Sequence, residues 1–161
     1  MASDGAKLVL AASQGNDAKV KRLLKAKVDV DFGVVNEDGV SGCTALQDAC
    51  LNGSVGAVRL LLKSKATVNL RDSQGRAAML GASELGHIDC VRLLLEAKAE
   101  VDQPGNDGST PIHGSAATAR AGDERRGRRR RQLWRALAAA LGGGGGGAAV
   151  GALGLDRLVA A

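Results

Sequence analysis

A motif that returns every 33 residues constrains this chain more than any other feature. Thr44, Ala77 and Thr110 stand at this spacing, each before an apolar helical pattern. The copy at residues 72–102, DSQGRAAMLGASELGHIDCVRLLLEAKAEVD, has joints of equal length to both of its neighbours. A unit this short cannot bury its own apolar face, so the copies have to stack side by side into one continuous core.

Each copy predicts two short helices divided by a glycine. Apolar residues recur at helical spacing on both sides of Gly15, Gly53 and Gly86. A glycine in the left-handed conformation ends the first helix and permits a sharp turn. Thr44 is expected to cap the first helix of its copy. The helix pairs end in LLKAKVDVD, LLKSKATVN and LLEAKAEVD, so a short extended piece and a polar turn follow each pair.

The composition suits closely stacked short helices. The chain has one Phe, one Trp and no Tyr, so its core has to be built from Leu, Val, Ala, Ile and Met. Three cysteines (Cys43, Cys50 and Cys90) fit no metal spacing and indicate reduced thiols. No secretory signal is expected, and no stretch reaches the roughly 20 apolar residues of a membrane span. These features predict an intracellular protein.

When the copies are aligned with one another, their shared motifs resemble the sequence pattern of the ankyrin repeat family. GSTPIH at residues 108–113 is close to that family's G-x-T-P-L-H, and GCTAL at residues 42–46 is a weaker copy. Gly86 and His87, followed by VRLLL at residues 91–95, match the second-helix half. The resemblance covers about residues 6–118 and implies an all-α, ankyrin-repeat helical solenoid.

The chain divides into a repeat domain and a tail. We expect a polar lead (1–5), three repeats (6–35, 36–71 and 72–104), a partial fourth repeat (105–118) and an Arg/Ala/Gly-rich tail (119–161). The tail is expected to be mostly disordered or weakly helical. Leu133, Trp134, Leu137 and Leu141 favour a helix there that could cover the open end of the solenoid.

Two departures from the family pattern affect the loops. The joint before the second copy is longer than the others and contains Phe32, Val34 and Val35. These apolar residues either fold back on the first repeat or form a finger that binds a partner. Lys27, Lys65 and Lys98 stand where the family usually has glycine, and are expected to adopt the left-handed conformation. They would form a ladder along one edge, either solvated or as a docking edge for an acidic partner.

No catalytic, metal or cofactor motif is found in the sequence. His87 and His113 stand at family positions where the resemblance implies hydrogen bonds to the backbone. Cys50 and Cys90 are expected to be packing residues, and Cys43 is either a packing residue or a reactive thiol near a helix start. We therefore expect no enzyme activity and no cofactor.

The resemblance implies protein binding on the concave face, which loop tips and first helices form. The positions that it places there are Ser13, Gln14, Leu51, Asn52, Arg71, Ser73, Gln74, Arg76, Glu84, Leu85, Asn106, Asp107 and Ser109. Leu51 and Leu85 either form a small solvent-facing apolar strip or pack against neighbouring helices. The predicted function is non-catalytic protein binding by a monomer, and the sequence does not indicate which protein is bound.

The basic tail leaves alternatives open to the predicted function. Residues 1–116 hold 13 Lys and Arg against 14 Asp and Glu, whereas residues 117–161 hold nine Arg against three acidic residues. Six arginines form a run: Arg125, Arg126, Arg128, Arg129, Arg130 and Arg131. This run is either incidental or a contact for nuclear import, nucleic acid or an anionic surface. The chain would then be a nuclear or polyanion-associated adaptor rather than a cytoplasmic one. A third reading is a truncated fragment of a larger ankyrin protein.

Overall fold

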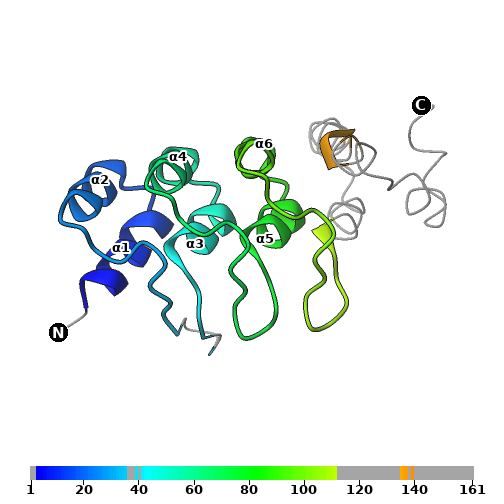
Figure 1. Cartoon of the computed structure of the whole chain (residues 1–161), viewed down its shortest axis with the longest axis horizontal. Coiled ribbons are helices and arrows are strands. Elements are labelled where there is room, and N and C mark those ends of the chain that lie inside the picture. The colour runs from blue at the N-terminus through cyan, green and yellow to red at the C-terminus, as the bar shows by residue number, and fades with distance from the viewer. Residues whose placement is uncertain (1–2, 36–38, 40, 112–134, 138, 140–161) are drawn as a thin grey trace.

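The computed structural model describes residues 3–35, 39, 41–111, 135–137 and 139. Its helices come in three successive pairs, as the sequence predicts (Figure 1). The pairs are α1 (Asp4–Ser13) with α2 (Asp17–Lys25), α3 (Ala45–Leu51) with α4 (Val55–Lys63), and α5 (Ala78–Leu85) with α6 (Ile88–Glu96). The predicted all-α solenoid is confirmed.

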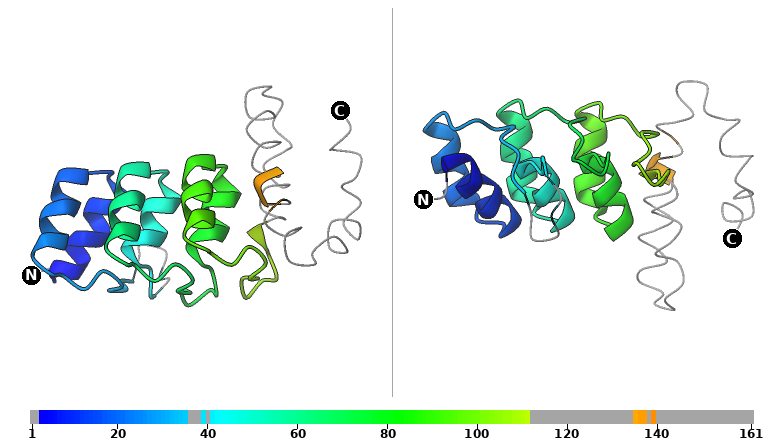
Figure 2. Two further views of the ribbon diagram at one scale, coloured as in Figure 1. Left: turned by 45° about the horizontal axis from the view of Figure 1, so that its top comes forward. Right: turned by 90° about the horizontal axis from the view of Figure 1, so that it is seen from below.

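The helices form two layers that run along the solenoid. The first helices α1, α3 and α5 make one layer, and the second helices α2, α4 and α6 make the other (Figure 2). Loops project from the side of the first-helix layer between successive pairs (Figure 1). Helix α3 packs against α1, α4 and α5, so each repeat is held by its neighbours rather than by one central core.

Local sequence sets the helix ends. Gly15, Gly53 and Gly86 lie between paired helices with φ of 64°, 67° and 74°, which confirms the predicted left-handed turns. Thr44 caps α3, because its Oγ1 accepts a hydrogen bond from Gln47 N at 3.3 Å. Gln47 Oε1 accepts one in return from Thr44 N at 2.7 Å, which completes a capping box.

Small residues allow the layers to approach closely. Ala11, Ala12, Ala49 and Ala82 are fully buried on the first helices. Larger side chains fill the space between the layers: Leu8, Leu46, Val58, Leu61, Met79, Val91 and Leu94. The core is therefore built from aliphatic residues, as the composition requires.

The three lysines at the family's glycine position adopt the left-handed conformation. Lys27, Lys65 and Lys98 have φ of 56°, 63° and 60°, and each lies just after a second helix. A Cβ atom makes this conformation costly, by about 1 kcal/mol per residue. The prediction is confirmed, and all three side chains are exposed.

The long first loop folds back in part. The half-buried Phe32 ring lies against Gly5 of α1, where a Cβ atom would collide with it. Val34 pairs with Cys43 through two backbone hydrogen bonds of 2.9 and 3.1 Å. Val35, in contrast, is 68% exposed. The fold-back interpretation is therefore correct for Phe32, whereas Val34 pairs with Cys43 of the second repeat and Val35 is exposed.

Part of the predicted tail helix belongs to the folded core. Residues 135–137 are helical, and the Leu137 side chain is fully buried within the same hydrophobic cluster as Leu94. The other three members of the predicted cluster, Leu133, Trp134 and Leu141, lie outside the described residues.

Candidate functional site

The first helices present one face to solvent on the loop side of the solenoid. On α1 this face carries Leu10, Ser13 and Gln14, which share a side of the helix because they are three and four positions apart. The hydroxyl of Ser13 donates to the Leu10 carbonyl at 2.9 Å, while Gln14 is exposed. Leu10 is 51% exposed, and the sequence pattern did not indicate it as a contact residue.

On α3 the same three positions are Asp48, Leu51 and Asn52. Asn52 is exposed, and its amide donates to the Asp48 carbonyl at 2.9 Å. Leu51 is half-buried, because it packs over Gly81 of α5, where a Cβ atom would lie 2.8 Å from Leu51 Cδ2. Asp48, like Leu10, was missed, although its spacing from Leu51 could have indicated it.

On α5 the face continues through Glu84 and Leu85. Leu85 is 55% exposed, whereas Leu51 is covered in part by the neighbouring helix. Of the two alternatives, packing against a neighbouring helix is therefore correct for Leu51, because the glycine at position 81 leaves space for its side chain. Leu85 alone remains as an exposed apolar side chain on this part of the face.

The loop tips are tied to one another in series. Ser73 N donates to the Ser41 carbonyl at 2.8 Å, and Ser41 N donates to Ser73 Oγ at 3.1 Å. Asn106 N donates to the Gln74 carbonyl at 2.8 Å, and its amide Nδ2 donates to the Ser73 carbonyl at 3.0 Å. Arg71 donates to Gly75 and Pro104 carbonyls. Through these hydrogen bonds, the predicted site residues fix the positions of neighbouring loop tips relative to one another.

Two Asp side chains in the loops also find hydrogen-bond partners within their own turns. Asp72 Oδ1 accepts from the backbone N of Arg76 at 2.9 Å, and Asp72 Oδ2 lies 3.2 Å from Arg76 Nε. Asp107 accepts hydrogen bonds from the hydroxyl and the backbone N of Ser109. These bonds lower the pKa of the Asp107 carboxyl below its ordinary value.

Two carboxylates on the face lack such partners. Burial raises the pKa of Asp48 and of Glu84 above their ordinary values. For Glu84, nearby Arg76 partly offsets this rise and Asp107 adds to it. Neither carboxylate forms a salt bridge with another described residue. The structure thus brings together three predicted residues, Arg76, Glu84 and Asp107. Asp107 is hydrogen-bonded to Ser109, whereas Glu84 forms no salt bridge with another described residue.

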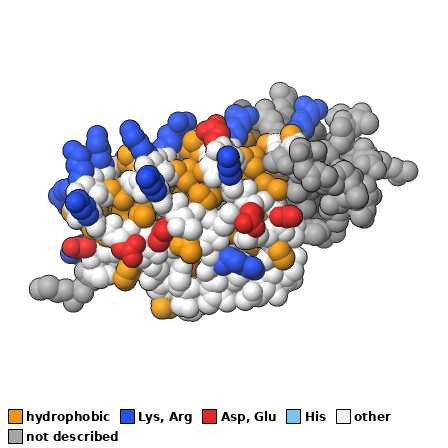
Figure 3. Space-filling model, viewed as in Figure 1, with side chains coloured by type: hydrophobic (Ala, Val, Ile, Leu, Met, Phe, Trp, Pro, Cys, Tyr) orange, Lys and Arg blue, Asp and Glu red, His pale blue; other side chains and the backbone are white. Residues whose placement is uncertain are grey.

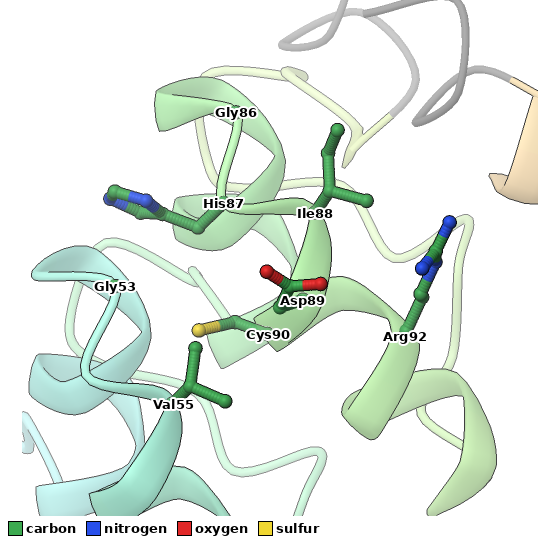
Figure 4. Close-up of a pocket in the computed structure, with 8 residues that line it drawn as sticks. All are labelled: Gly53, Val55, Gly86, His87, Ile88, Asp89, Cys90 and Arg92. Carbon is green, nitrogen blue, oxygen red and sulfur yellow. The ribbon is translucent and has the colours of Figure 1, made fainter. Parts of the chain in front are cut away.

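A pocket of about 350 Å³ lies elsewhere, where the turn between α3 and α4 meets the start of α6 (Figure 4). It is lined by Gly53, Val55, Gly86, His87, Ile88, Asp89, Cys90 and Arg92. His87 Nε2 donates to the Leu51 carbonyl at 3.0 Å, and the His87 ring packs against Gly53. His87 thus links two repeats through the backbone, as expected, while His113 lies outside the described residues.

The cysteines pack in the interior. Cys50 and Cys90 are fully buried, which confirms their predicted packing role. Contact with the Cys90 thiol, together with burial, raises the pKa of the Cys50 thiol well above its ordinary value. Cys43 is 1% exposed and so is not accessible to a reagent in solution. Within the described ranges, no cluster of three His, Cys, Asp or Glu side chains could hold a metal ion.

The remaining predicted contact residues cannot be placed. The arginine run, residues 125–131, lies outside the described residues, so its proposed roles stay predictions. Among the helices that the structure describes, none is long and apolar enough to cross a membrane.

Comparison with known proteins agrees with the architecture. The family model for ankyrin repeats (three copies) matches residues 8–105, which run from within α1 to beyond the end of α6. A search of curated proteins found no matching relative. With three consecutive helix pairs, left-handed turns between them and a family match over more than half of its length, the chain belongs to the ankyrin repeat family.

Proposed function

We propose that this chain binds a protein partner, without catalysis, through the loop-side face of its first helices. Ankyrin repeats are generally protein–protein interaction modules. The observation that carries the finer proposal is Glu84, a half-buried carboxylate that forms no salt bridge with another described residue and is adjacent to the exposed Leu85.

The chemistry of this face indicates the partner segment that it would fit. Burial of Asp48 and Glu84 costs stability, because their charged forms are partly removed from water. A Lys or Arg placed against either carboxylate would recover this cost and add an ion pair worth about 1 kcal/mol. Leu10 and Leu85 offer apolar contact at the two ends of the same face. We infer a partner segment that combines basic and apolar side chains.

The other predicted residues take supporting roles in this proposal. Exposed Gln14 and Asn52 supply polar contacts at the edges of the face. Ser73 and Asn106 act through the loop tips, whose hydrogen bonds hold the face in one shape. A preformed surface loses less conformational entropy when it binds.

Selection from a peptide library tests the proposal. The full chain is used to select peptides from a displayed library that lacks Asp and Glu. We expect the enriched peptides to carry Lys or Arg next to large apolar residues. Hydrogen exchange with a selected peptide bound should slow in α3, α5 and residues 71–76. Protection confined to α2, α4 and α6, or to the tail, would contradict the proposal.

A further inference from the structure

The second-helix layer of the solenoid is basic, whereas the remainder of residues 1–116, first helices and loops together, is acidic. The second helices with the turns that end them, residues 17–27, 55–65 and 88–98, hold ten Lys and Arg against three Asp and Glu. The rest of residues 1–116 holds three Lys and Arg against eleven Asp and Glu. Figure 3 shows Lys and Arg gathered along the second-helix side and most acidic side chains nearer the loops.

The basic residues form two regular rows across the repeats. Helices α2, α4 and α6 begin at Asp17, Val55 and Ile88, so their fifth residues are equivalent. The first row consists of these residues, Lys21, Arg59 and Arg92; the second consists of the left-handed lysines, Lys27, Lys65 and Lys98. All six side chains are exposed. We call the surface of these six residues the basic face.

No described carboxylate forms a salt bridge with a residue of the basic face. The salt bridges among the described residues are Lys7–Asp4 and Arg76–Asp72, and both lie on other parts of the molecule. Like charges repeated across neighbouring helices repel one another, so the arrangement favours an anion that bridges the rows.

We propose that the basic face is a second docking surface, which binds an Asp/Glu-rich polypeptide segment of a partner. The rows run across α2, α4 and α6, whose axes are about 8–10 Å apart. Roughly six extended residues therefore reach from α2 to α6. This surface is separate from the first-helix face and takes a partner of the opposite charge.

The side chains of the basic face favour an acidic polypeptide over other polyanions. Proteins that lie on membranes insert apolar side chains beside their basic ones. The large exposed hydrophobic residues of the described chain, Leu10, Val35 and Leu85, all lie outside α2, α4 and α6. Single-stranded nucleic acids are bound by basic residues interleaved with aromatic ones, and these three helices contain no aromatic residue.

Charge decreases along the face. Residues 17–27 carry a net +4 (five basic, one acidic) and residues 55–65 a net +3 (three basic). Residues 88–98 are neutral, because Asp89 and Glu96 balance Arg92 and Lys98. An acidic segment should therefore contact α2 and α4 most strongly.

The test uses the full chain and a fluorescein-labelled peptide that alternates Glu with Ser. One triple variant is Lys21→Gln with Arg59→Gln and Arg92→Gln. A second is Lys27→Asn with Lys65→Asn and Lys98→Asn, which cannot act by strain because Asn tolerates the left-handed conformation. The matched control removes three charges from the tail, by Arg128→Gln, Arg129→Gln and Arg130→Gln.

We expect each basic-face variant to raise the dissociation constant about tenfold, since three exposed ion pairs are lost. The tail variant should lose clearly less affinity for the peptide. The second triple variant should be at least as stable to unfolding as the parent. Wild-type affinity in both basic-face variants, or an equal or larger loss in the tail variant, overturns the proposal. Tighter binding of phosphatidylserine vesicles or of duplex DNA than of the peptide also overturns it.

Discussion

Thr44 and Ala77 hold the same backbone conformation at the start of equivalent helices, but only Thr44 caps its helix. Their φ and ψ angles are −91° and 164° for Thr44 and −94° and 166° for Ala77. Thr44 accepts a hydrogen bond from Gln47 N, whereas Ala77 makes no side-chain cap. The third repeat thus keeps the geometry of a capped helix without the capping side chain.

Ala77→Thr should therefore stabilise the protein, by at most about 1 kcal/mol, because the hydroxyl adds a side-chain acceptor to the first turn of α5, where Leu80 N now donates to the Ala77 carbonyl at 3.0 Å. Thr44→Ala, the reciprocal change, should destabilise it by a similar amount. Urea unfolding of the two variants measures both effects. Equal destabilisation by both substitutions would show that the environments of α3 and α5 are not equivalent.

The third repeat also contains a buried hydroxyl that should lower its stability. Ser83 is fully buried, and its Oγ has no hydrogen-bond partner among the described residues. The equivalent positions hold the apolar Ala12 and the thiol of Cys50, which contacts Cys90. Ser83→Ala should raise the free energy of unfolding by about 1 kcal/mol, since the unpaired group is removed.

The control for Ser83 is the opposite change in the first repeat. Ala12→Ser introduces a hydroxyl into a fully buried site, so it should lower the free energy of unfolding by about 1–3 kcal/mol. A loss of stability in Ser83→Ala would instead indicate a bond to a group beyond the described part of the chain.

Local pattern predicted the repeat but not how the repeats touch. The glycines after the first helices, the Thr44 cap and the left-handed lysines each depend on a few adjacent residues, and all were predicted. The position of Leu51 depends on the missing side chain at Gly81, one repeat away. The roles of Ser73 and Asn106 likewise depend on bonds between loop tips. Such contacts need the stacking geometry, which a periodic pattern alone does not supply.

Leu137 tests whether part of the tail is built into the fold. Its side chain is fully buried within the core cluster. Leu137→Ala should cost about 2–5 kcal/mol, as other buried leucines do. Leu85→Ala, at an exposed position, should change stability by less than about 0.5 kcal/mol. If thermal unfolding shows no difference between these variants, residues 135–137 do not contribute to the stability of the repeats.

Glu84 and Asp107 should affect stability with opposite signs as pH changes. The folded-state pKa of Glu84 is raised above its ordinary 4.5, so its ionisation destabilises the fold as pH rises through that window. Glu84→Gln should therefore stabilise the protein at neutral pH, and the gain should vanish in acid, where the wild-type carboxyl is protonated in both states.

For Asp107 the folded-state pKa is lowered below the ordinary 3.8, so the ionised group stabilises the fold at neutral pH. Asp107→Asn should lose stability there, and the loss should shrink as pH falls below 3.8. Denaturant midpoints measured from neutral to acid pH compare the two variants. The same sign of change for both would contradict the electrostatic assignment.

In the proposed function, the partner binds the first-helix face around Glu84. The most direct test measures the affinity of one selected basic peptide for Glu84→Lys and for Glu96→Lys. The two substitutions are chemically identical, but Glu84 lies on α5 and Glu96 ends α6 in the other layer. We predict that Glu84→Lys weakens binding about tenfold or more, because a favourable charge contact becomes repulsive. Glu96→Lys should leave the affinity within about twofold of wild type, since an exposed charge change away from the contact has little effect. Equal losses in both variants, or a loss in Glu96→Lys alone, would contradict binding at the first-helix face.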